Sequence, residues 1–226
     1  MKRPSQKPNQ MPGQIPGRKQ EGKPKKPPGS VRIIGGQWRG RRVPVPDIEG
    51  LRPSGDRCRE TLFNWLQPFL HNAKCVDLFA GTGVLGLEAV SRGAACAVLV
   101  EKSRVAANSL RQSVEMLEAK DIAVIEADAL SWLAQQAPSS MDIVFVDPPF
   151  ALNMADRGMA EQGMAEKVVA ALAQTLALRP GGLVYLESAA PDPAPVPGPG
   201  WEVLKEKRVG DVRMHLLKRL TGVLPT

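Results

Sequence analysis

The sequence has no hydrophobic run that approaches the length of a membrane-spanning helix, and it has few cysteines. Its N-terminus carries basic residues without an apolar core segment, so we expect no secretory signal. The three cysteines, Cys58, Cys75 and Cys96, are far apart and odd in number. This spacing offers neither a metal-ligand cluster nor a disulfide framework, which is typical of a reducing compartment. We therefore expect a cytoplasmic protein with no membrane partner and no bound metal.

The charge of the chain is unevenly distributed. The net charge of +7 is the sum of +7 on residues 1–30, +4 on residues 31–59 and −4 on residues 60–226. A near-neutral body with a basic N-terminal quarter predicts contact with a polyanion. Residues 1–30 are rich in Pro, Gly, Gln and Lys, so we expect a disordered basic tail, for which a solubilising role is the alternative.

One stretch, residues 141–150, combines a buried strand with a polar turn. Residues 143–146 are apolar and mostly β-branched, as in a strand buried on both faces of a parallel sheet. Pro148 and Pro149 end this strand at Asp147. The turn then offers the Asp147 carboxylate, the Pro148 carbonyl and the Phe150 ring at the sheet edge where open α/β folds bind ligands. These groups could hold the amino group and the face of a planar base; a proline turn in a carbohydrate or redox enzyme is the alternative.

From Cys75 onward, strands alternate with helices. The expected strands are residues 75–79, 97–101, 122–126, 141–147 and 183–187, followed by a hairpin of residues 201–207 and 212–218. Helices are expected from the glycine turn to about residue 92, over 103–118, shortly after residue 128, and over 164–178, where residues 179–182 stop the last one. This alternation predicts a parallel sheet with helices on both faces.

A second basic element precedes that alternation. Residues 31–34 and 42–45 are expected to form a hairpin with arginines at its tip. Trp38 in that tip could stack on an unpaired base or pack the hairpin onto the domain. A helix over residues 56–67 should follow, ended or kinked by Pro68, with Arg57 and Arg59 off its apolar stripe and facing a ligand.

A glycine pattern, G-x-G-x-x-G over residues 81–86, follows the first strand and opens a helix. Its glycines would allow close backbone approach to a ligand, and Glu101 could accept both hydroxyls of a ribose. Asp77, just before the turn, would repel a pyrophosphate but suits the ammonium group of an amino-acid moiety. Asp128 could accept from an adenine amino group or cap the next helix.

The sequence resembles the S-adenosylmethionine-dependent amino-methyltransferases in residues 77–83, Glu101, Asp128 and residues 147–150. Within this class, the sequence resembles the bacterial 16S ribosomal RNA guanine-N2 methyltransferases, the RsmD family, over about residues 31–220. This closer resemblance is carried by residues 32–41, 51–53 and 56–65. The resemblance implies an α/β, Rossmann-like class I methyltransferase fold. Its seven-stranded, mostly parallel sheet would end in an antiparallel strand, with an N-terminal β-hairpin extension. The expected division is a tail of residues 1–30, an RNA-contacting extension of residues 31–55 and a catalytic domain of residues 56–226.

The resemblance also implies a cofactor, a partner and site residues. S-adenosylmethionine would be the cofactor of a monomeric enzyme, and 16S rRNA, within an assembling small ribosomal subunit, its partner. The catalytic residues would be Asp147, Pro148, Pro149 and Phe150. The cofactor would be bound by Asp77, Phe79, Gly81, Thr82, Gly83, Gly86, Glu101, Asp128 and Ala129. The RNA would be contacted by Arg32, Trp38, Arg39, Arg41, Arg42, Arg52 and Arg57.

Three rival functions are compatible with parts of these patterns. A NAD-dependent dehydrogenase would use the glycine turn and Glu101, but it leaves residues 147–150 and the arginine hairpin unexplained. A non-catalytic RNA-binding module would not need a complete cofactor turn or Asp147. Among methyltransferases, an adenine-N6 enzyme acting on DNA is the alternative, since the turn at Asp147 can accept either amino group.

Overall fold

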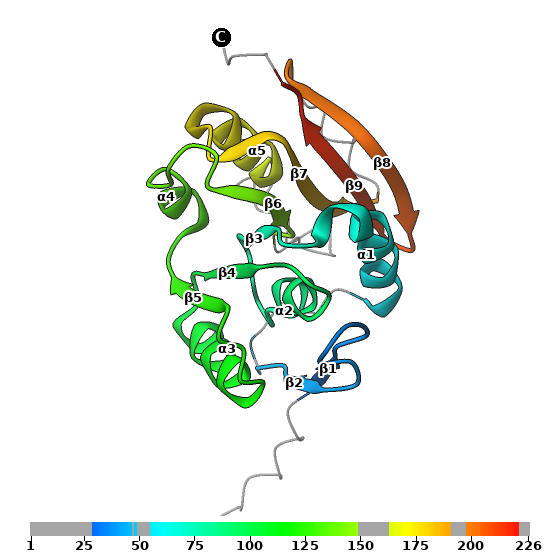
Figure 1. Ribbon diagram of the computed structural model, residues 1–226, viewed down its shortest axis with the longest axis vertical. Coiled ribbons are helices and arrows are strands. Elements are labelled where there is room, and N and C mark those ends of the chain that lie inside the picture. Colours follow the sequence, from blue (N-terminus) through cyan, green and yellow to red (C-terminus); the bar gives the residue numbers. More distant parts are fainter. Residues whose placement is uncertain (1–28, 47, 49–54, 149–162, 191–197, 222–226) are drawn as a thin grey trace, which may run out of the picture.

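The core of the protein is one seven-stranded sheet with the strand order β5-β4-β3-β6-β7-β9-β8 (Figure 1). The computed structural model describes residues 29–46, 48, 55–148, 163–190 and 198–221. The strands are β3 (Lys74–Asp77), β4 (Cys96–Glu101), β5 (Ile122–Glu126), β6 (Met141–Val146), β7 (Leu178–Ala189), β8 (Trp201–Val209) and β9 (Val212–Arg219). Pairing is parallel from β5 through β7, and β9 is antiparallel to both β7 and β8. The predicted mostly parallel sheet with an antiparallel last strand is confirmed.

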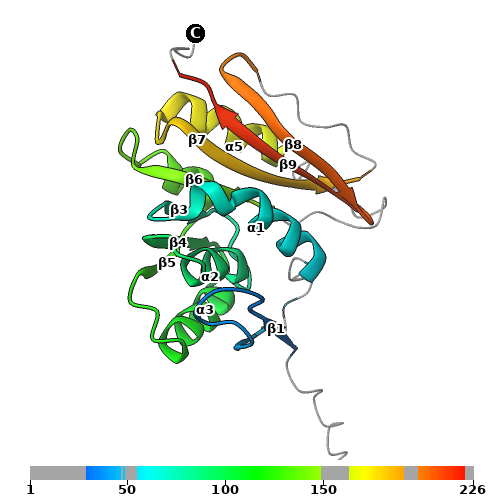
Figure 2. The same cartoon turned by 45° about the vertical axis from the view of Figure 1, so that its right-hand side comes forward.

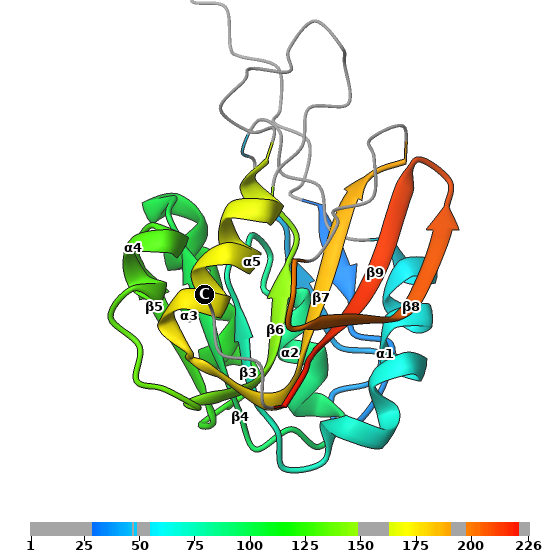
Figure 3. The ribbon, with the colours of Figure 1, turned by 90° about the horizontal axis from the view of Figure 1, so that it is seen from above.

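Helices cover both faces of this sheet, as the alternation predicted (Figure 3). On one face α1 (Asp56–Leu70), α2 (Val84–Ser91) and α3 (Arg104–Met116) pack on side chains such as Phe145 and Tyr185. On the other, α4 (Ala129–Leu133) and α5 (Met164–Thr175) pack on side chains such as Val144. Because successive strand residues point to opposite faces, β6 has to be apolar at every position from Ile143 to Val146.

Two helix ends differ from the expectation. Helix α1 continues through Pro68 to Leu70, three residues past the predicted end. Proline removes only one backbone N–H there, in the last turn, and the apolar side of the helix remains packed on the core. Helix α5 ends at Thr175 because Leu176 adopts a left-handed conformation with φ of 56°. Residues 179–182, expected to stop the helix, belong instead to β7, where its register with β6 shifts.

The N-terminal hairpin pairs β1 (Ser30–Arg32) with β2 (Arg42–Pro44) and lies beside α2 and α3 (Figures 1 and 2). Its turn is attached to the end of α2: the backbone N–H groups of Gln37 and Trp38 donate to the carbonyl and hydroxyl of Ser91 at 2.8 and 3.0 Å. Gly36, with φ of 75°, approaches so closely that a Cβ atom would meet the Ser91 carbonyl oxygen at 1.8 Å. The hairpin is therefore a fixed part of the folded domain.

Within the described residues, no helix is long and apolar enough to cross a membrane. The predicted disordered tail lies almost wholly outside the described residues, which begin at Gly29.

Candidate active site

Three neighbouring parallel strands carry a carboxylate at or just beyond their carboxyl ends. Asp77 ends β3, where it pairs in register with Leu99 of β4 and Phe145 of β6. Glu101 lies two residues beyond Leu99, and Asp147 two residues beyond Phe145. Since side chains two apart on a strand share a face, the three carboxylates collect at one sheet edge. The structure thus brings together the residues that the sequence placed at the ends of separate strands.

Asp77 is the most buried of the three. Its side chain is 2% exposed, and its Oδ1 atom is buried without a hydrogen-bond partner among the described residues. Burial and, secondly, the negative charge of Asp147 raise the pKa of Asp77 to about 7. A buried carboxylate oxygen without a partner is the kind of group that a bound ammonium stabilises.

The glycine turn leads from Asp77 into α2. Gly81 and Gly83 have φ angles of 51° and 74°, which favour glycine over residues with side chains. A Cβ atom on Gly83 would meet the Leu110 side chain at 2.5 Å, and one on Gly86 would meet Leu99 at 2.2 Å. Gly83 therefore also makes room for α3, and Gly86 lets α2 pack tightly against β4, which are structural roles beside the expected one in ligand approach. Thr82, in the same turn, is buried.

Glu101 is tied to this turn. Its Oε2 atom accepts from the Gly81 N–H at 2.8 Å, and its Oε1 atom accepts from the Ser103 N–H at 2.7 Å. Each carboxylate oxygen can accept a second hydrogen bond, so both ribose hydroxyls predicted for Glu101 still find acceptors. The two backbone contacts hold the carboxylate in a fixed orientation.

Asp128 caps a helix. It precedes α4, and its Oδ1 atom accepts from the Ser131 N–H at 3.1 Å, while Lys102 Nζ lies 3.5 Å from Oδ2. The hydrogen bond from the Ser131 backbone is the main cause that lowers the pKa of Asp128. This is the capping alternative that the sequence left open. The side chain is nearly half exposed, so it keeps acceptor capacity toward a ligand, and Ala129 beside it is buried.

The turn after β6 is described only in part. Asp147 is partly exposed and Pro148 is buried, whereas Pro149 and Phe150 lie outside the described residues. Phe79, expected near the cofactor, packs against the side chains on the α4 and α5 face.

One further carboxylate at this edge, Glu187, was not among the predicted site residues. It lies on β7 one residue beyond Leu186, which pairs with Val146 of β6, and so it flanks Asp147 at the same edge. Glu187 is 4% exposed and accepts a hydrogen bond of 2.5 Å from the Tyr185 hydroxyl. Burial, followed by the charge of Asp147, raises its pKa to about 8. A signal was present in the sequence, because Glu187 ends the predicted fifth strand as Glu101 ends the predicted second strand.

The predicted RNA-contacting residues surround the hairpin. Arg39 and Arg57 are exposed, and Arg41 and Arg42 donate to the Met116 carbonyl and the Ser30 hydroxyl at 2.9 and 3.0 Å. Arg32 is an exposed partner of Asp56 at 3.7 Å. Trp38 is partly buried and packs against the core, as one of the two interpretations proposed. Arg52 lies outside the described residues.

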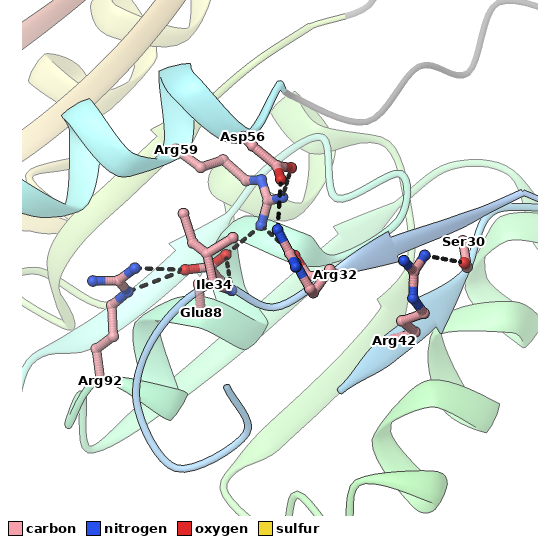
Figure 4. Close-up of polar contacts among 8 residues, drawn as sticks. All are labelled: Ser30, Arg32, Ile34, Arg42, Asp56, Arg59, Glu88 and Arg92. Carbon is pink, nitrogen blue, oxygen red and sulfur yellow. Dashed lines mark hydrogen bonds and ion pairs between the residues drawn. The ribbon is translucent and has the colours of Figure 1, made fainter. Parts of the chain in front are cut away.

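Arg59 does not face a ligand, contrary to the prediction. Its side chain is fully buried, forms ion pairs with Glu88 and Asp56, and donates to the Arg32 carbonyl (Figure 4). The prediction for Arg59 was wrong because the hairpin and α2 cover the side of α1 on which Arg59 lies, away from the apolar stripe. Glu88 also accepts from Arg92 and from the Ile34 N–H at 3.0 Å. This buried ionic cluster joins the hairpin, α1 and α2.

No group of three or more His, Cys, Asp or Glu side chains in the described part of the chain is arranged to hold a metal ion. The sheet order, the glycine turn and the carboxylates at the strand ends define a Rossmann-like class I methyltransferase.

Comparison with known proteins identifies the family. The family described as conserved hypothetical protein 95 matches residues 31–218. Ribosomal RNA small subunit methyltransferase D of Escherichia coli is 43% identical over 191 residues, which cover 84% of this chain and 91% of the relative. The protein of the same name in Haemophilus influenzae is 41% identical, covering 83% of this chain and 93% of the relative. The chain belongs to this family.

A solved structure agrees with that assignment. The structure of yhhF from Escherichia coli superposes with a TM-score of 0.75 at 41% identity, covering 85% of this chain and 99% of the other. S-adenosylmethionine is the methyl donor of the family, and the described residues fit it. Asp77 offers a buried acceptor for its ammonium group, and Glu101 offers acceptors for its ribose.

Proposed function

We propose that this protein transfers a methyl group from S-adenosylmethionine to the N2 amino group of a guanine in 16S ribosomal RNA. The observation that carries the proposal is the position of Asp147 at the sheet edge near Asp77, whose buried Oδ1 atom has no hydrogen-bond partner in the part of the chain that the structure describes. A cofactor whose ammonium group binds Asp77 would extend along the glycine turn toward Glu101. The target base would then be held from the side of Asp147.

The chemistry requires the amino nitrogen to act as a nucleophile. The lone pair of guanine N2 is delocalised into the ring, so the nitrogen is unreactive until it pyramidalises. Hydrogen bonds from its two N–H groups to the Asp147 carboxylate and the Pro148 carbonyl favour that geometry and direct the lone pair outward. Both bonds strengthen as positive charge develops on nitrogen, which is the selective transition-state stabilisation that catalysis needs.

When bound, S-adenosylmethionine supplies an electrophilic methyl group, whose C–S bond breaks with its electron pair going to sulfur as nitrogen forms the N–C bond. The methylated nitrogen then carries a positive charge and loses one proton. Asp147, partly exposed, can accept this proton and release it to water. Phe150 would stack on the base, which has to be unpaired or splayed out to reach the site.

The names of the relatives support ribosomal RNA of the small subunit as the substrate class. The arginines of the hairpin support binding to its phosphates, and residues 31–55 form the RNA-contacting extension in this proposal. We further propose that the enzyme acts as a monomer on an assembling small subunit in the cytoplasm. The tail, residues 1–30, adds phosphate contacts.

The test is transfer of labelled methyl groups from S-adenosylmethionine to 16S rRNA, free and within small-subunit particles, followed by nucleoside analysis. We expect the label in N2-methylguanosine. Label in N6-methyladenosine, or faster methylation of DNA than of RNA, would support the adenine-N6 alternative. Titration with NADH serves as a control, because a dehydrogenase would bind NADH and not S-adenosylmethionine.

A further inference from the structure

Glu187 and Tyr185 form a buried pair that the proposed reaction does not yet use. Tyr185 pairs in register with Phe145 of β6, and Glu187 lies two residues further along β7 on the same face. Asp147 lies two residues beyond Phe145, just past the end of β6, so the register brings Asp147 and Glu187 to neighbouring positions on adjacent strands. Parallel strands are spaced about 4.8 Å apart, and at this separation the negative charge of Asp147 acts on Glu187.

The surroundings of Glu187 disfavour a second negative charge there. Its side chain is buried, and within the described residues no Lys, Arg or His lies within 4.0 Å of it. The ionisable groups that interact with it are Tyr185 on its own strand, Asp147 just after β6, Asp77 at the end of β3 and the buried thiol of Cys58 on α1. Lys207 of β8 also acts on the Cys58 thiol, and it donates to Thr61 of α1 at 3.5 Å. Two carboxyl groups in such a site share one charge between them, because like charges this close cannot both ionise cheaply.

Tyr185 determines which oxygen of Glu187 is available. Its hydroxyl donates to Oε1 of Glu187, and the Tyr185 ring is itself fixed against Phe145 with ring centroids 6.5 Å apart. The other oxygen, Oε2, is the one left to carry a proton toward the neighbouring carboxylate. Burial and the charge of Asp147 keep that proton bound at neutral pH, since they raise the pKa of Glu187 to about 8.

We propose that Glu187, protonated and oriented by Tyr185, is a positioning residue for methyl transfer. Its carboxyl proton is directed at Asp147 and orients that carboxylate toward the target amino group. This inference rests on the proposed role of Asp147 and adds the residues that orient it. It does not depend on which amino group, guanine N2 or adenine N6, is methylated.

The variant Glu187→Gln tests the proposal, because its amide keeps a donor at the same place but cannot lose the proton. We expect the kcat of Glu187→Gln at pH 7 to stay close to that of the wild type. The wild-type kcat should fall as pH rises through the pKa of Glu187, and this fall should be absent in Glu187→Gln. Glu187→Ala should lose about 10- to 100-fold in kcat with little change in KM for the cofactor, since only orientation is lost.

The variant Tyr185→Phe gives a second test, in which the direction of the shift in the pH profile of kcat is predicted. The Tyr185 hydroxyl stabilises ionised Glu187 and lowers its pKa, so removing the hydroxyl should move the alkaline fall in kcat to higher pH. Equal losses in Glu187→Gln and Glu187→Ala at every pH would overturn the proposal. So would an unchanged alkaline fall in Glu187→Gln, which would assign that fall to another group.

A titration without turnover separates this inference from the proposed function. Carboxyl carbons of ¹³C-labelled glutamate can be followed by NMR, with Glu187→Gln identifying the resonance. In Asp147→Asn the midpoint of Glu187 should move to lower pH, because the neighbouring negative charge is gone. An unmoved midpoint would refute the coupling even if the enzyme methylates RNA as proposed. A downward shift would support it even if no guanine is methylated.

Discussion

Arg59 and Glu88 form an ion pair in which both side chains are fully buried, and this pair joins helix α1 to helix α2. The carboxylate of Glu88 also accepts from Arg92 and from the Ile34 N–H of the hairpin region, so one residue holds three elements together (Figure 4). Helix α2 begins at the glycine turn beside Asp77, which connects the cluster directly to the proposed cofactor site.

Breaking this pair should strongly destabilise the fold. Glu88→Ala removes the fully buried acidic partner of the buried Arg59 charge, and should lower the free energy of unfolding by about 3–5 kcal/mol. The double variant Arg59→Met, Glu88→Leu should recover much of that loss, because neither charge remains buried. Urea denaturation measures both.

A matched control is the exposed pair of Arg111 and Glu126, 3.8 Å apart, for which Glu126→Ala should cost less than about 1 kcal/mol. If Glu88→Ala were no more destabilising than this control, the cluster would not hold the hairpin and helices together.

Asp77 and Glu101 should be required for cofactor binding. Asp77→Asn removes the charge that faces the ammonium group, and should weaken S-adenosylmethionine binding roughly 10- to 100-fold. Glu101→Ala removes acceptors for the ribose and also for the N–H groups of Gly81 and Ser103, so it should weaken binding more than Glu101→Gln.

Isothermal titration calorimetry measures these affinities. Glu126 pairs in register with Glu101 on the neighbouring strand but is exposed, so Glu126→Ala serves as the control and should bind the cofactor normally. Unchanged affinity in Asp77→Asn would place the ammonium group elsewhere.

The hairpin arginines should dominate RNA affinity. Replacing Arg39, Arg41 and Arg42 by alanine should flatten the slope of log affinity against log salt by roughly 0.7–0.9 for each lost phosphate contact. Deleting residues 1–28 should flatten it too, yet leave methylation measurable and its site unchanged, because the hairpin arginines lie on a folded element whose contacts cost less ordering entropy.

The control neutralises three exposed basic residues away from the hairpin, Arg104, Lys167 and Lys205, and should leave the slope almost unchanged. Because Arg41 and Arg42 also make hydrogen bonds within the protein, thermal unfolding of the triple variant has to be measured alongside. An unaltered slope in a folded triple variant would remove the hairpin from the RNA interface.

Glu187 should make stability fall with rising pH. Its pKa is raised from 4.5 to about 8 by burial and by Asp147, so the folded state binds its proton more tightly than the unfolded state. The associated stability is fully present below pH 4.5 and is lost as pH rises through 8. Glu187→Gln should therefore melt at a higher temperature than the wild type at pH 8.5, with the difference shrinking toward pH 4.5. A constant difference across this range would show that Glu187 does not titrate as described.

The carboxyl ends of the strands could be predicted from the sequence, because a run of apolar residues stops there at a polar residue. An apolar run that ends in a carboxylate places Asp77, Glu101 and Asp147 at one edge of any parallel sheet, whatever the details of packing. The antiparallel last strand followed from the resemblance alone, since residues 201–219 carry no local signal for their place in the sheet.

Arg59 shows why the remainder could not be predicted. The apolar stripe of α1 defines which side faces the core, but the opposite side is covered by a hairpin and a helix that are distant in sequence. The available hint was Glu88, a charged residue in the otherwise uncharged helix Val84–Ser91, all of whose residues are buried. A lone buried charge requires a partner, and Arg59 is that partner.

The role of Asp147 is tested most directly by single-turnover methyl transfer to small-subunit RNA, with cofactor saturating, in the wild type, Asp147→Ala and Asp147→Asn. Calorimetry on the same samples gives the cofactor affinity. If Asp147 holds the target amino group beside the cofactor site, Asp147→Ala should lose essentially all transfer while binding S-adenosylmethionine within a few-fold of the wild type. Asp147→Asn, which keeps one acceptor oxygen, should retain more. Near-wild-type transfer by a folded Asp147→Ala protein would contradict the account.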